Sequence, residues 1–355
     1  MIYSQFNNIK ISAMSAAVSK NIQKIEDLKT SENERIIEQF IKKTGIVQIH
    51  KAPFEQTASD FGYSAAKLIE ANGYYKPEEI GVLVNITQNP DYRTPSTACV
   101  LQNRLGLKKS CIAFDINLGC SGFVYGVTIA ASLLQSSNAE KALVIIGDTL
   151  ARGRKKEVPG AKRYSNTALL FGDATSAVLI EKCVDSVIYS GLMTDGSGHK
   201  ALSTPYGAWK HPEGPEAYPG DDIAVFNFTI SEVPSMIKEF LLRTKTDILD
   251  YDALVLHQAN MMIMKQIARK VKMPMEKVPV SLDRFGNTSG ASVPLTIVDQ
   301  YGNVNNGKTL TLLASGYGVG LSWGVVSFKI NDTDILPLCI SNDIYEDGYE
   351  DDFKD

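Results

Sequence analysis

The sequence predicts an α/β layered protein with two similar halves, and two observations support this prediction. First, apolar runs of strand length alternate with amphipathic segments; the runs span 79–87, 111–117, 142–148 and 168–181. Second, in each half an amphipathic stretch is followed by acidic spacer residues and then by a buried strand. This repetition indicates a tandem duplication, although two α/β units can also look alike without a common origin.

Local signals place the individual elements. Phe61, Ala65 and Leu68 share one face of 57–72, so this segment predicts a helix that ends at Gly73. In the second half, the amphipathic stretch 233–246 precedes a strand at 251–258, and another helix-like segment follows at 260–271, with Asn260 as its N-cap. The polar, turn-rich segments 151–165 and 194–221 predict exposed loops.

Composition excludes several classes of protein. The 355 residues include 44% hydrophobic and 21% charged residues, with a formal net charge of -4, so a nucleic-acid-binding surface is not expected. Residues 1–20 lack the organisation of a signal peptide, and no apolar run is long enough to span a membrane. We therefore expect a cytoplasmic protein without membrane contact. The odd number of cysteines, without a CxxC spacing, predicts neither a zinc site nor a disulfide framework; they are Cys99, Cys111, Cys120, Cys183 and Cys339.

Cys120 stands between two glycines in DINLGCSG (115–122), where a predicted strand gives way to a helix. Backbone N–H groups and the helix dipole favour a thiolate at such a position, so we expect a lowered thiol pKa and a nucleophilic sulfur. The flanking glycines permit a sharp turn and close approach of a substrate. A lone cysteine is more often a buried structural residue, and this segment alone leaves both roles open.

His257 and Asn287 are further candidates. His257 ends the strand 251–258, at the edge of an α/β sheet where ligands usually bind, although a core histidine with satisfied hydrogen bonds is an equal alternative. Asn287 lies in DRFGNTSGASVPL (283–295), where a loop or capping role is the simpler interpretation. The glycine-rich segment LLASGYGVGLSWG (312–324) offers backbone N–H groups suited to one wall of an oxyanion hole. It lacks the helix and acidic residue of a dinucleotide site.

Taken together and in this order, these segments resemble the ketoacyl-acyl-carrier-protein synthase III family of the thiolase superfamily. The resemblance extends from Lys43 to Phe328 and includes PSTACVLQNRLG (95–106), DTLAR (148–152) and FGDATSAVL (171–179). It implies a five-layered αβαβα core and a homodimer. The implied division is an N-terminal half over 1–182, a C-terminal half over 183–330 and an acidic tail over 331–355. From Asn342 onward the tail is rich in acidic residues, so there we expect loose packing and no catalytic role.

The resemblance also implies a mechanism in fatty-acid or related lipid biosynthesis. Cys120 would accept an acyl group from an acyl-CoA or acyl-carrier protein, and the backbone N–H groups of Cys120 and Val319 would hold the oxyanion. His257 and Asn287 would donate hydrogen bonds to the thioester oxygen of malonyl-carrier protein during decarboxylation. The thioesters are substrates, and no metal or redox cofactor is implied.

Two residues separate this activity from related ones. Asn287 cannot take up a proton, so decarboxylative condensation is favoured over acyl transfer or proton abstraction that uses a carboxylate base. A thiolase would need a second catalytic cysteine, and Cys339 lies outside the glycine-rich loop. A non-condensing acyltransferase and a silent partner subunit remain as alternatives.

Other positions depart from the family pattern around a coenzyme A nucleotide. Gln39 and Lys43 stand where relatives that use acetyl-CoA have a tryptophan and an arginine, whereas Arg152 matches the family's adenine clamp. An acyl-carrier-protein donor therefore becomes plausible. Met262 replaces an arginine that helps relatives to dock the carrier protein. The basic side chains that we expect to form the docking surface instead are those of Lys265, Arg269 and Lys270.

Thr94 concerns the size of the acyl pocket. Relatives often have a phenylalanine here that closes the pocket across the dimer, so threonine predicts room for a primer longer than acetyl. The alternative is that neighbouring bulk from Tyr92 or Tyr317 refills the space.

Overall fold

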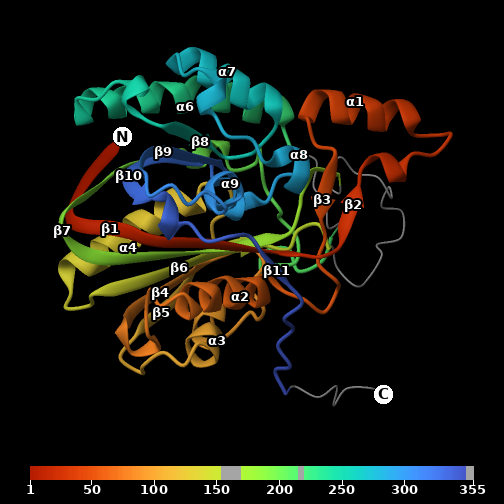
Figure 1. The fold of residues 1–355 in the computed structure, drawn as a ribbon. Coiled ribbons are helices and arrows are strands. Elements are labelled where there is room, and N and C mark those ends of the chain that lie inside the picture. The colour runs from red at the N-terminus through yellow and green to blue at the C-terminus, as the bar shows by residue number, and fades with distance from the viewer. Residues whose placement is uncertain (153–168, 215–219, 349–355) are drawn as a thin grey trace.

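The structure is a computed structural model and describes residues 1–152, 169–214 and 220–348. In this part of the chain, a mixed sheet of nine strands is surrounded by helices (Figure 1). Its strands are β1 (Ile2–Ser19), β4 (Ile80–Ile86), β5 (Ile112–Ile116), β6 (Lys141–Asp148), β7 (Ala174–Thr194), β8 (Ala253–Leu256), β9 (Thr309–Gly318), β10 (Ser322–Asn331) and β11 (Cys339–Ser341). A separate short pair is formed by β2 (Ile22–Lys24) and β3 (Gln48–His50).

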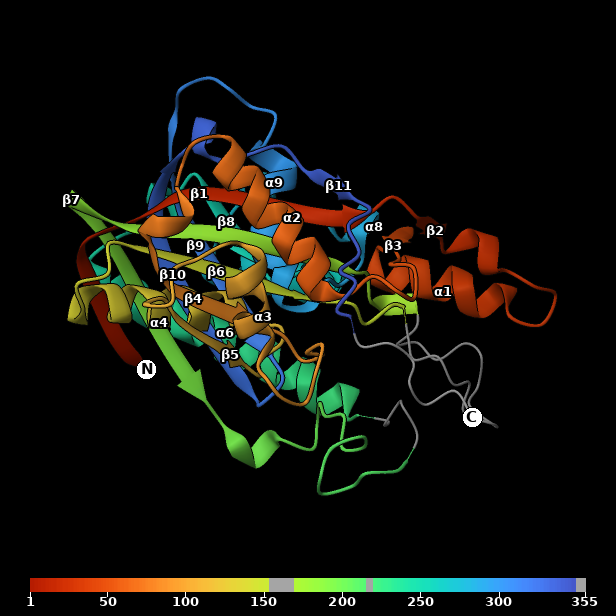
Figure 2. The ribbon, with the colours of Figure 1, turned by 90° about the horizontal axis from the view of Figure 1, so that it is seen from below.

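The helices lie in three layers that alternate with the two halves of the sheet (Figures 1 and 2). α2 (Ala58–Ala71) and α3 (Thr97–Arg104) cover one outer face, whereas α6 (Asp222–Thr244) and α7 (Met261–Val271) cover the other. The central layer contains α4 (Gly122–Ser136) and α9 (Ser292–Tyr301). Two further α-helices of the described part are α1 (Glu34–Thr44), beside the β2–β3 pair, and the short α8 (Leu282–Phe285). The predicted five-layered fold is therefore confirmed.

The two halves repeat one strand arrangement. In the first half, β4 and β6 are parallel, and β7 and β1 then follow in antiparallel pairs. In the second half, β8 and β9 are parallel, and β10 and β7 follow in the same way. β7 serves both halves, because its residues 174–181 pair with β6 and its residues 189–194 pair with β10. The division between residues 182 and 183 stays a prediction, and it falls inside this shared strand.

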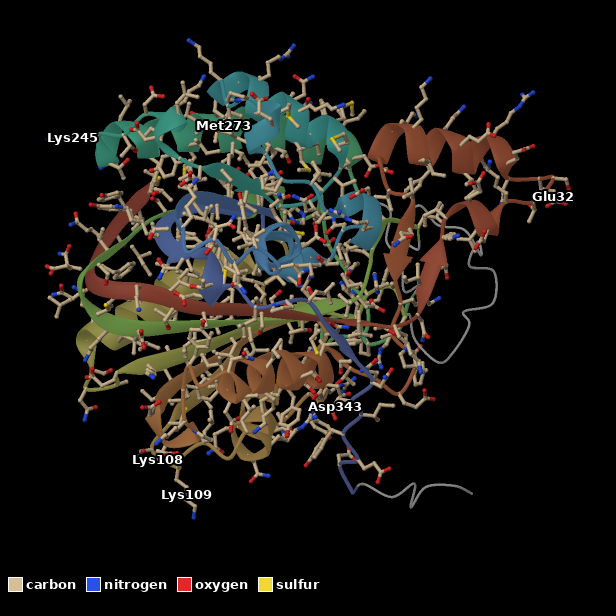
Figure 3. All side chains as sticks on the ribbon, viewed as in Figure 1. Glu32, Lys108, Lys109, Lys245, Met273 and Asp343 are labelled. Atoms are coloured by element: carbon tan, nitrogen blue, oxygen red, sulfur yellow. The ribbon has the colours of Figure 1, made fainter. Side chains whose placement is uncertain are left out.

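Burial explains why the layers hold together. Phe123 and Val127 of α4, together with Val293 of α9, are completely buried between the two sheet halves. Outer layers are amphipathic: on α7 the residues Ile263 and Met264 are buried, whereas charged residues face outward. Figure 3 shows this separation, with Lys108, Lys109 and Lys245 projecting from the two outer sides of the molecule.

Most predicted elements are present. The 57–72 helix is α2, where Asp60 accepts a hydrogen bond from the Thr57 N–H at 2.9 Å, and Asn260 caps α7 by accepting from the Ile263 N–H at 2.9 Å. The strand expected over 168–181 begins later and continues to Thr194. β1 and α1 were not predicted. Most of the loop predicted over 151–165 lies outside the described residues, and 194–221 forms largely exposed loops where it is described.

The first part of the tail, residues 331–341, packs on the core. Its strand β11 pairs in parallel with β1, and the buried Leu336 donates its N–H to the Met14 carbonyl at 2.8 Å. Further along, the Tyr345 ring lies 4.4 Å from the Arg104 guanidinium carbon, whose head group pairs with buried Asp60 at 3.0 Å. Apolar side chains and a strand pairing therefore hold 332–341 on the core. Residues 342–348, for which loose packing is predicted, are largely exposed. Residues 349–355 lie outside the described part.

None of the described helices is both long and apolar enough to cross a membrane.

Candidate active site

Cys120 lies at the turn between β5 and α4, and only 6% of the residue is exposed. The Gly122 N–H donates to the Gly119 carbonyl at 2.7 Å and closes the turn. The sequence places the thiol correctly, at the start of a helix in the interior of the molecule.

The β9–β10 hairpin packs directly on Cys120, and glycine makes this possible. A Cβ at Gly318 would lie 2.7 Å from the Cys120 Cβ and 3.0 Å from its Sγ, whereas one at Gly316 would lie 2.8 Å from the Cys120 carbonyl oxygen. The backbone groups of Cys120 itself and of Val319 hydrogen-bond to the sulfur. The two amides predicted to form an oxyanion hole are thus gathered at one atom.

The prediction of a lowered thiol pKa is wrong for the free protein. Burial first, and the negative charge of Asp148 second, raise the pKa of Cys120 to about 12. Hydrogen bonds from Ser289 and from the Cys120 and Val319 backbone act in the opposite direction but do not outweigh burial. The cysteine is therefore a neutral thiol at neutral pH until something in the site changes.

His257 follows β8 and is held from two sides. Its N–H donates to the Ser315 carbonyl at 2.8 Å, and its Nδ1 lies 2.6 Å from the Ser292 hydroxyl. Burial lowers the pKa of His257 to about 3, with a small opposing contribution from the Ser289 backbone, so the imidazole is neutral. A neutral imidazole that accepts the Ser292 hydroxyl at Nδ1 carries its proton on Nε2.

Tyr317 contacts this histidine rather than standing apart as pocket bulk. Its ring meets the His257 ring edge-on, with 5.3 Å between centroids, and its hydroxyl donates to the His257 carbonyl at 3.0 Å. Its phenol is buried, and burial first and the Cys120 charge second raise its pKa. Tyr317 therefore contacts the predicted histidine and feels the charge of the predicted nucleophile.

Asn287 lies in the loop between α8 and α9 and is 5% exposed. Its Oδ1 accepts a hydrogen bond from the Ser289 N–H at 2.9 Å, which fixes the oxygen end of the amide. The Nδ2 group is consequently the end that can donate to a ligand.

Three polar residues of the site were missed from the sequence. Ser289 hydrogen-bonds Cys120, and Gln88 donates from Nε2 to the Ser289 hydroxyl at 2.9 Å. The same Gln88 nitrogen donates to Asp148 at 3.1 Å. Ser292 contacts His257 as described above. Gln88 directly follows a predicted strand that ends near Thr87, so the rule that ligands bind at strand ends offered a signal for it. The serines carried no such signal.

The residues predicted to bind the coenzyme or primer lie farther out. Lys43 and Thr94 are exposed on the single chain. Arg152 donates to the backbone carbonyls of Phe54 and Gln56 and lies over the Phe54 ring. These contacts anchor Arg152 beside the loop after β3, and its role towards a nucleotide stays a prediction. Tyr92 donates to Asp347 of the tail at 2.6 Å.

The basic side chains of α7 form an exposed row. Lys265, Arg269 and Lys270 are exposed, opposite the buried face of the helix. Lys270 also donates to the Ile230 carbonyl on α6 at 2.8 Å. This row, which we call the α7 basic face, stays a prediction as a docking surface.

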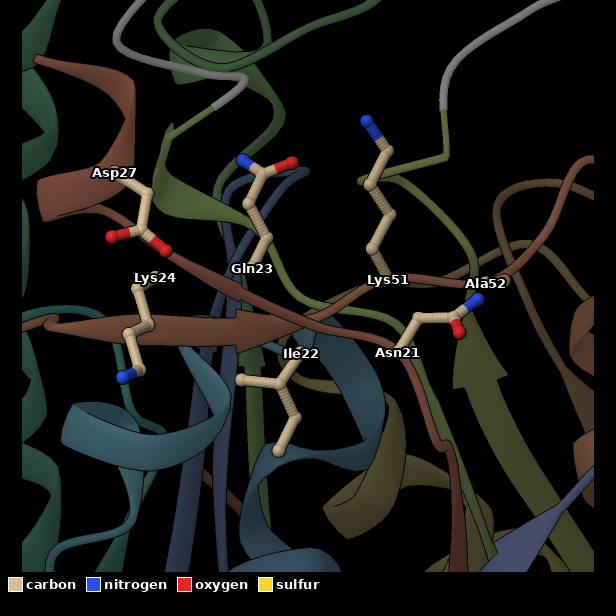
Figure 4. A pocket seen from close by; sticks show the side chains of 7 residues that line it. All are labelled: Asn21, Ile22, Gln23, Lys24, Asp27, Lys51 and Ala52. Carbon is tan, nitrogen blue, oxygen red and sulfur yellow. The ribbon is translucent and has the colours of Figure 1, made fainter.

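A surface pocket lies at the β2–β3 pair and includes none of the predicted site residues (Figure 4). Lys24 and Lys51 point in different directions there, so their ammonium groups do not converge on one ligand. Its lining residues are Asn21, Ile22, Gln23, Lys24, Asp27, Lys51 and Ala52. Over the described ranges, no group of histidine, cysteine and acidic residues is arranged to hold a metal ion.

The fold and the geometry together define a thiolase-fold protein with a buried cysteine at the centre of its site. Comparisons with known proteins specify the family. Residues 114–196 match the family model of 3-oxoacyl-[acyl-carrier-protein (ACP)] synthase III, and residues 241–330 match the model of its C-terminal part.

Known relatives are similar to this chain over most of its length. The beta-ketoacyl-[acyl-carrier-protein] synthase III of Xanthomonas campestris pv. campestris (strain ATCC 33913) is 39% identical over 292 residues, which cover 79% of this chain and 86% of the relative. The enzyme of the same name from Xanthomonas euvesicatoria pv. vesicatoria (strain 85-10) is 38% identical, with coverages of 81% and 88%. A crystal structure of 3-oxoacyl-(acyl-carrier protein) synthase from Burkholderia xenovorans LB400 superposes with a TM-score of 0.88 at 29% identity, covering 96% of this chain and 99% of that one. The chain belongs to the 3-oxoacyl-[acyl-carrier-protein] synthase III family.

Proposed function

We propose that the protein catalyses decarboxylative condensation of an acyl primer with malonyl-acyl-carrier protein, through an acyl group held on Cys120. The observation that carries the proposal is the convergence on Ser289. This residue hydrogen-bonds Cys120, donates its N–H to Asn287 and contacts the imidazole of His257 through its backbone. A nucleophile and two neutral hydrogen-bond donors therefore surround one small space.

In the first step, the Cys120 sulfur attacks the carbonyl carbon of an acyl thioester. The N–H groups of Cys120 and Val319 hold the negative oxygen of the tetrahedral intermediate; such a donor typically lowers a barrier by about 3–4 kcal/mol. The carbon–sulfur bond to the carrier then breaks, and the released carrier thiolate takes the proton that the Cys120 thiol loses. A thioester is thus exchanged for a thioester, without an external acid or base.

In the second step, malonyl-acyl-carrier protein replaces the released carrier. His257 Nε2–H and Asn287 Nδ2–H donate hydrogen bonds to its thioester oxygen, where negative charge collects as carbon dioxide leaves. The resulting enolate carbon attacks the acyl carbonyl on Cys120. The carbon–sulfur bond breaks, Cys120 leaves as a thiolate and a 3-oxoacyl thioester is released. The Asn287 amide cannot act as a base that takes up a proton, so this site favours decarboxylation over proton abstraction.

The donor and its length form the finer part of the proposal. Threonine at position 94 is smaller than the phenylalanine of many relatives, and the Tyr92 hydroxyl donates a hydrogen bond to Asp347 of the tail. Tyr317 is fixed on His257. We therefore propose a primer longer than acetyl. Acetyl transfer to Cys120 as efficient as transfer of six- to eight-carbon chains would contradict this.

The carrier protein and a second subunit are the proposed partners. The α7 basic face suits an acidic carrier protein. β5 forms one edge of the nine-stranded sheet and exposes Ile112 to the extent of 47%, which suits pairing with a second copy of the chain. Light scattering tests the dimer directly, since a monomer at micromolar concentration would contradict it.

Release of carbon dioxide from malonyl-carrier protein tests the condensing function. We expect release to require an acyl donor and to yield one 3-oxoacyl product per carbon dioxide. Acyl exchange between donors without any carbon dioxide release would instead identify a non-condensing acyltransferase.

A further inference from the structure

We propose that the Ser289 hydroxyl donates a hydrogen bond to the Cys120 sulfur and that Gln88 orients this hydroxyl. Ser289 thereby acts as a catalytic residue of the acyl-transfer step, and Gln88 acts as a positioning residue. The inference rests on the proposed function, but the chemistry of the thiol that it concerns can be measured without any thioester substrate.

Hydrogen-bond directions carry the first step of the argument. Gln88 Nε2 lies 3.1 Å from Asp148 Oδ2 and 2.9 Å from the Ser289 Oγ. The Asp148 carboxylate only accepts, so it fixes the amide with its NH₂ group towards both partners. The Ser289 oxygen therefore accepts a hydrogen bond from Gln88, and its hydroxyl hydrogen remains to be donated to another acceptor.

That acceptor is the Cys120 sulfur. The Ser289 side chain hydrogen-bonds the thiol and opposes the rise of its pKa that burial and the Asp148 charge cause. The other titratable groups facing this region are Tyr317 of β9, with a raised pKa, and His257 after β8, which is neutral. Neither supplies a positive charge to the sulfur, so neutral donors are the means by which this site stabilises a thiolate.

Asp148 is itself firmly fixed, which makes Gln88 a rigid support. The carboxylate is 1% exposed and also accepts from the Thr87 hydroxyl at 2.9 Å and from the Gln88 N–H at 2.7 Å. Gln88 further packs against the turn that carries Cys120, because a Cβ at Gly119 would lie 2.5 Å from the Gln88 Nε2. The chain of contacts thus runs from β6, through the end of β4, to the nucleophile.

The backbone conformation of Ser289 also indicates that its hydroxyl has a role. Ser289 has a φ of 51°, in the left-handed region, and its N–H is committed to Asn287. Non-glycine residues adopt such a conformation at a cost, which is tolerated when surrounding contacts fix it. Glycine would adopt this backbone conformation at a lower cost, so the presence of a serine here points to a use for its hydroxyl.

The test is the rate of Cys120 alkylation by iodoacetamide between pH 6 and 10, measured by intact mass. We expect Ser289→Ala to lower the rate about tenfold at each pH, equivalent to a rise in thiol pKa of about one unit. Ser289→Gly, which relieves the backbone conformation, should give the same loss. Gln88→Leu should lower the rate about threefold in the wild type and not at all in Ser289→Ala, because it acts through the hydroxyl.

Ser176→Ala is the matched control. Ser176 is a fully buried serine of β7 whose hydroxyl has no hydrogen-bond partner, so its removal should leave the alkylation rate unchanged. Wild-type alkylation rates in both Ser289 variants would overturn the proposal. A Gln88→Leu loss that persists in Ser289→Ala would overturn the orienting role. Acylation of Cys120 by thioesters, measured separately, reports the proposed function, so failure of the two ideas can be distinguished.

Discussion

The two halves of the molecule prepare their reactive groups for opposite tasks. Burial keeps both groups neutral, because it raises the pKa of Cys120 and lowers the pKa of His257. The neighbours differ, however. Backbone N–H groups and a hydroxyl face the sulfur, whereas His257 has a hydroxyl at Nδ1 and the edge of an aromatic ring. The surroundings of Cys120, which come from both halves, stabilise negative charge on the sulfur, whereas His257 is held neutral and donates hydrogen bonds.

Removing the histidine should give the largest difference between the two reaction steps, acylation of Cys120 and condensation. In His257→Ala, we expect acylation of Cys120 to stay within about threefold of wild type, while condensation falls by roughly 10²–10³-fold because one enolate donor is lost. Intact mass measures acylation, and product formation from malonyl-carrier protein measures condensation. Equal losses in both would show that His257 serves both steps and would contradict the division.

Gly318→Ala, a change in the second half, should in turn displace the nucleophile of the first half. The added Cβ would lie 2.7 Å from the Cys120 Cβ and 3.0 Å from its Sγ, so we expect acylation to fall by about 10–100-fold through misplacement of the nucleophile. Gly196→Ala is the matched control, since nothing lies within 4 Å of its added Cβ. An acylation rate that does not change in Gly318→Ala would show that the hairpin is not in close contact with the thiol.

The two steps should also differ in pH dependence. The thiolate is the reactive form and the pKa of Cys120 is about 12, so the acylation rate should rise about tenfold per pH unit from pH 6 to 9. Condensation from preformed acyl-enzyme should stay level over the same range, because the His257 pKa of about 3 keeps the imidazole neutral. Stopped-flow measurements of each step check this. A plateau of acylation below pH 8 would mean that the thiol ionises far more easily than its burial predicts.

Ser292→Ala should produce the smallest effect and sharpen the role of His257. Loss of the 2.6 Å contact at Nδ1 frees the imidazole to carry its proton on either nitrogen. We expect condensation to fall by about 3–10-fold and Cys120 acylation to remain unchanged. Ser292→Thr, which keeps a hydroxyl, should recover most of the loss. A Ser292→Thr variant as slow as Ser292→Ala would indicate a purely steric role.

Much of the fold was predictable because its signals are local. Apolar runs revealed β4, β5 and β6, and a capping residue marked the start of α7. β1 was missed because polar residues at its start obscure the apolar pattern of a strand that is stabilised by pairing with β7 and β11. The packing of 332–341 was not predicted for a related reason, since local composition says nothing of the strand pairing that holds this segment on β1.

The site shows the same limit more sharply. Cys120, His257 and Asn287 were proposed from their segments taken together and from the resemblance to the family. The direction of the thiol pKa was predicted wrongly, because burial depends on how β9 and β10 close over the turn. Ser289 and Gln88 lie 201 residues apart in the sequence. Their contact arises from the fold and could not be inferred from either segment.

Intact-mass spectrometry of the wild-type protein and of Cys120→Ala, after incubation with acyl-CoAs and acyl-carrier proteins of two to twelve carbons, tests the central claim most directly. We expect the wild type to gain one acyl group as a thioester, the longer primers to react faster than acetyl and the variant to gain none. Absence of acylation on Cys120 from every donor, or equal acylation of Cys120→Ala, would contradict the role of Cys120 as the acyl-accepting nucleophile.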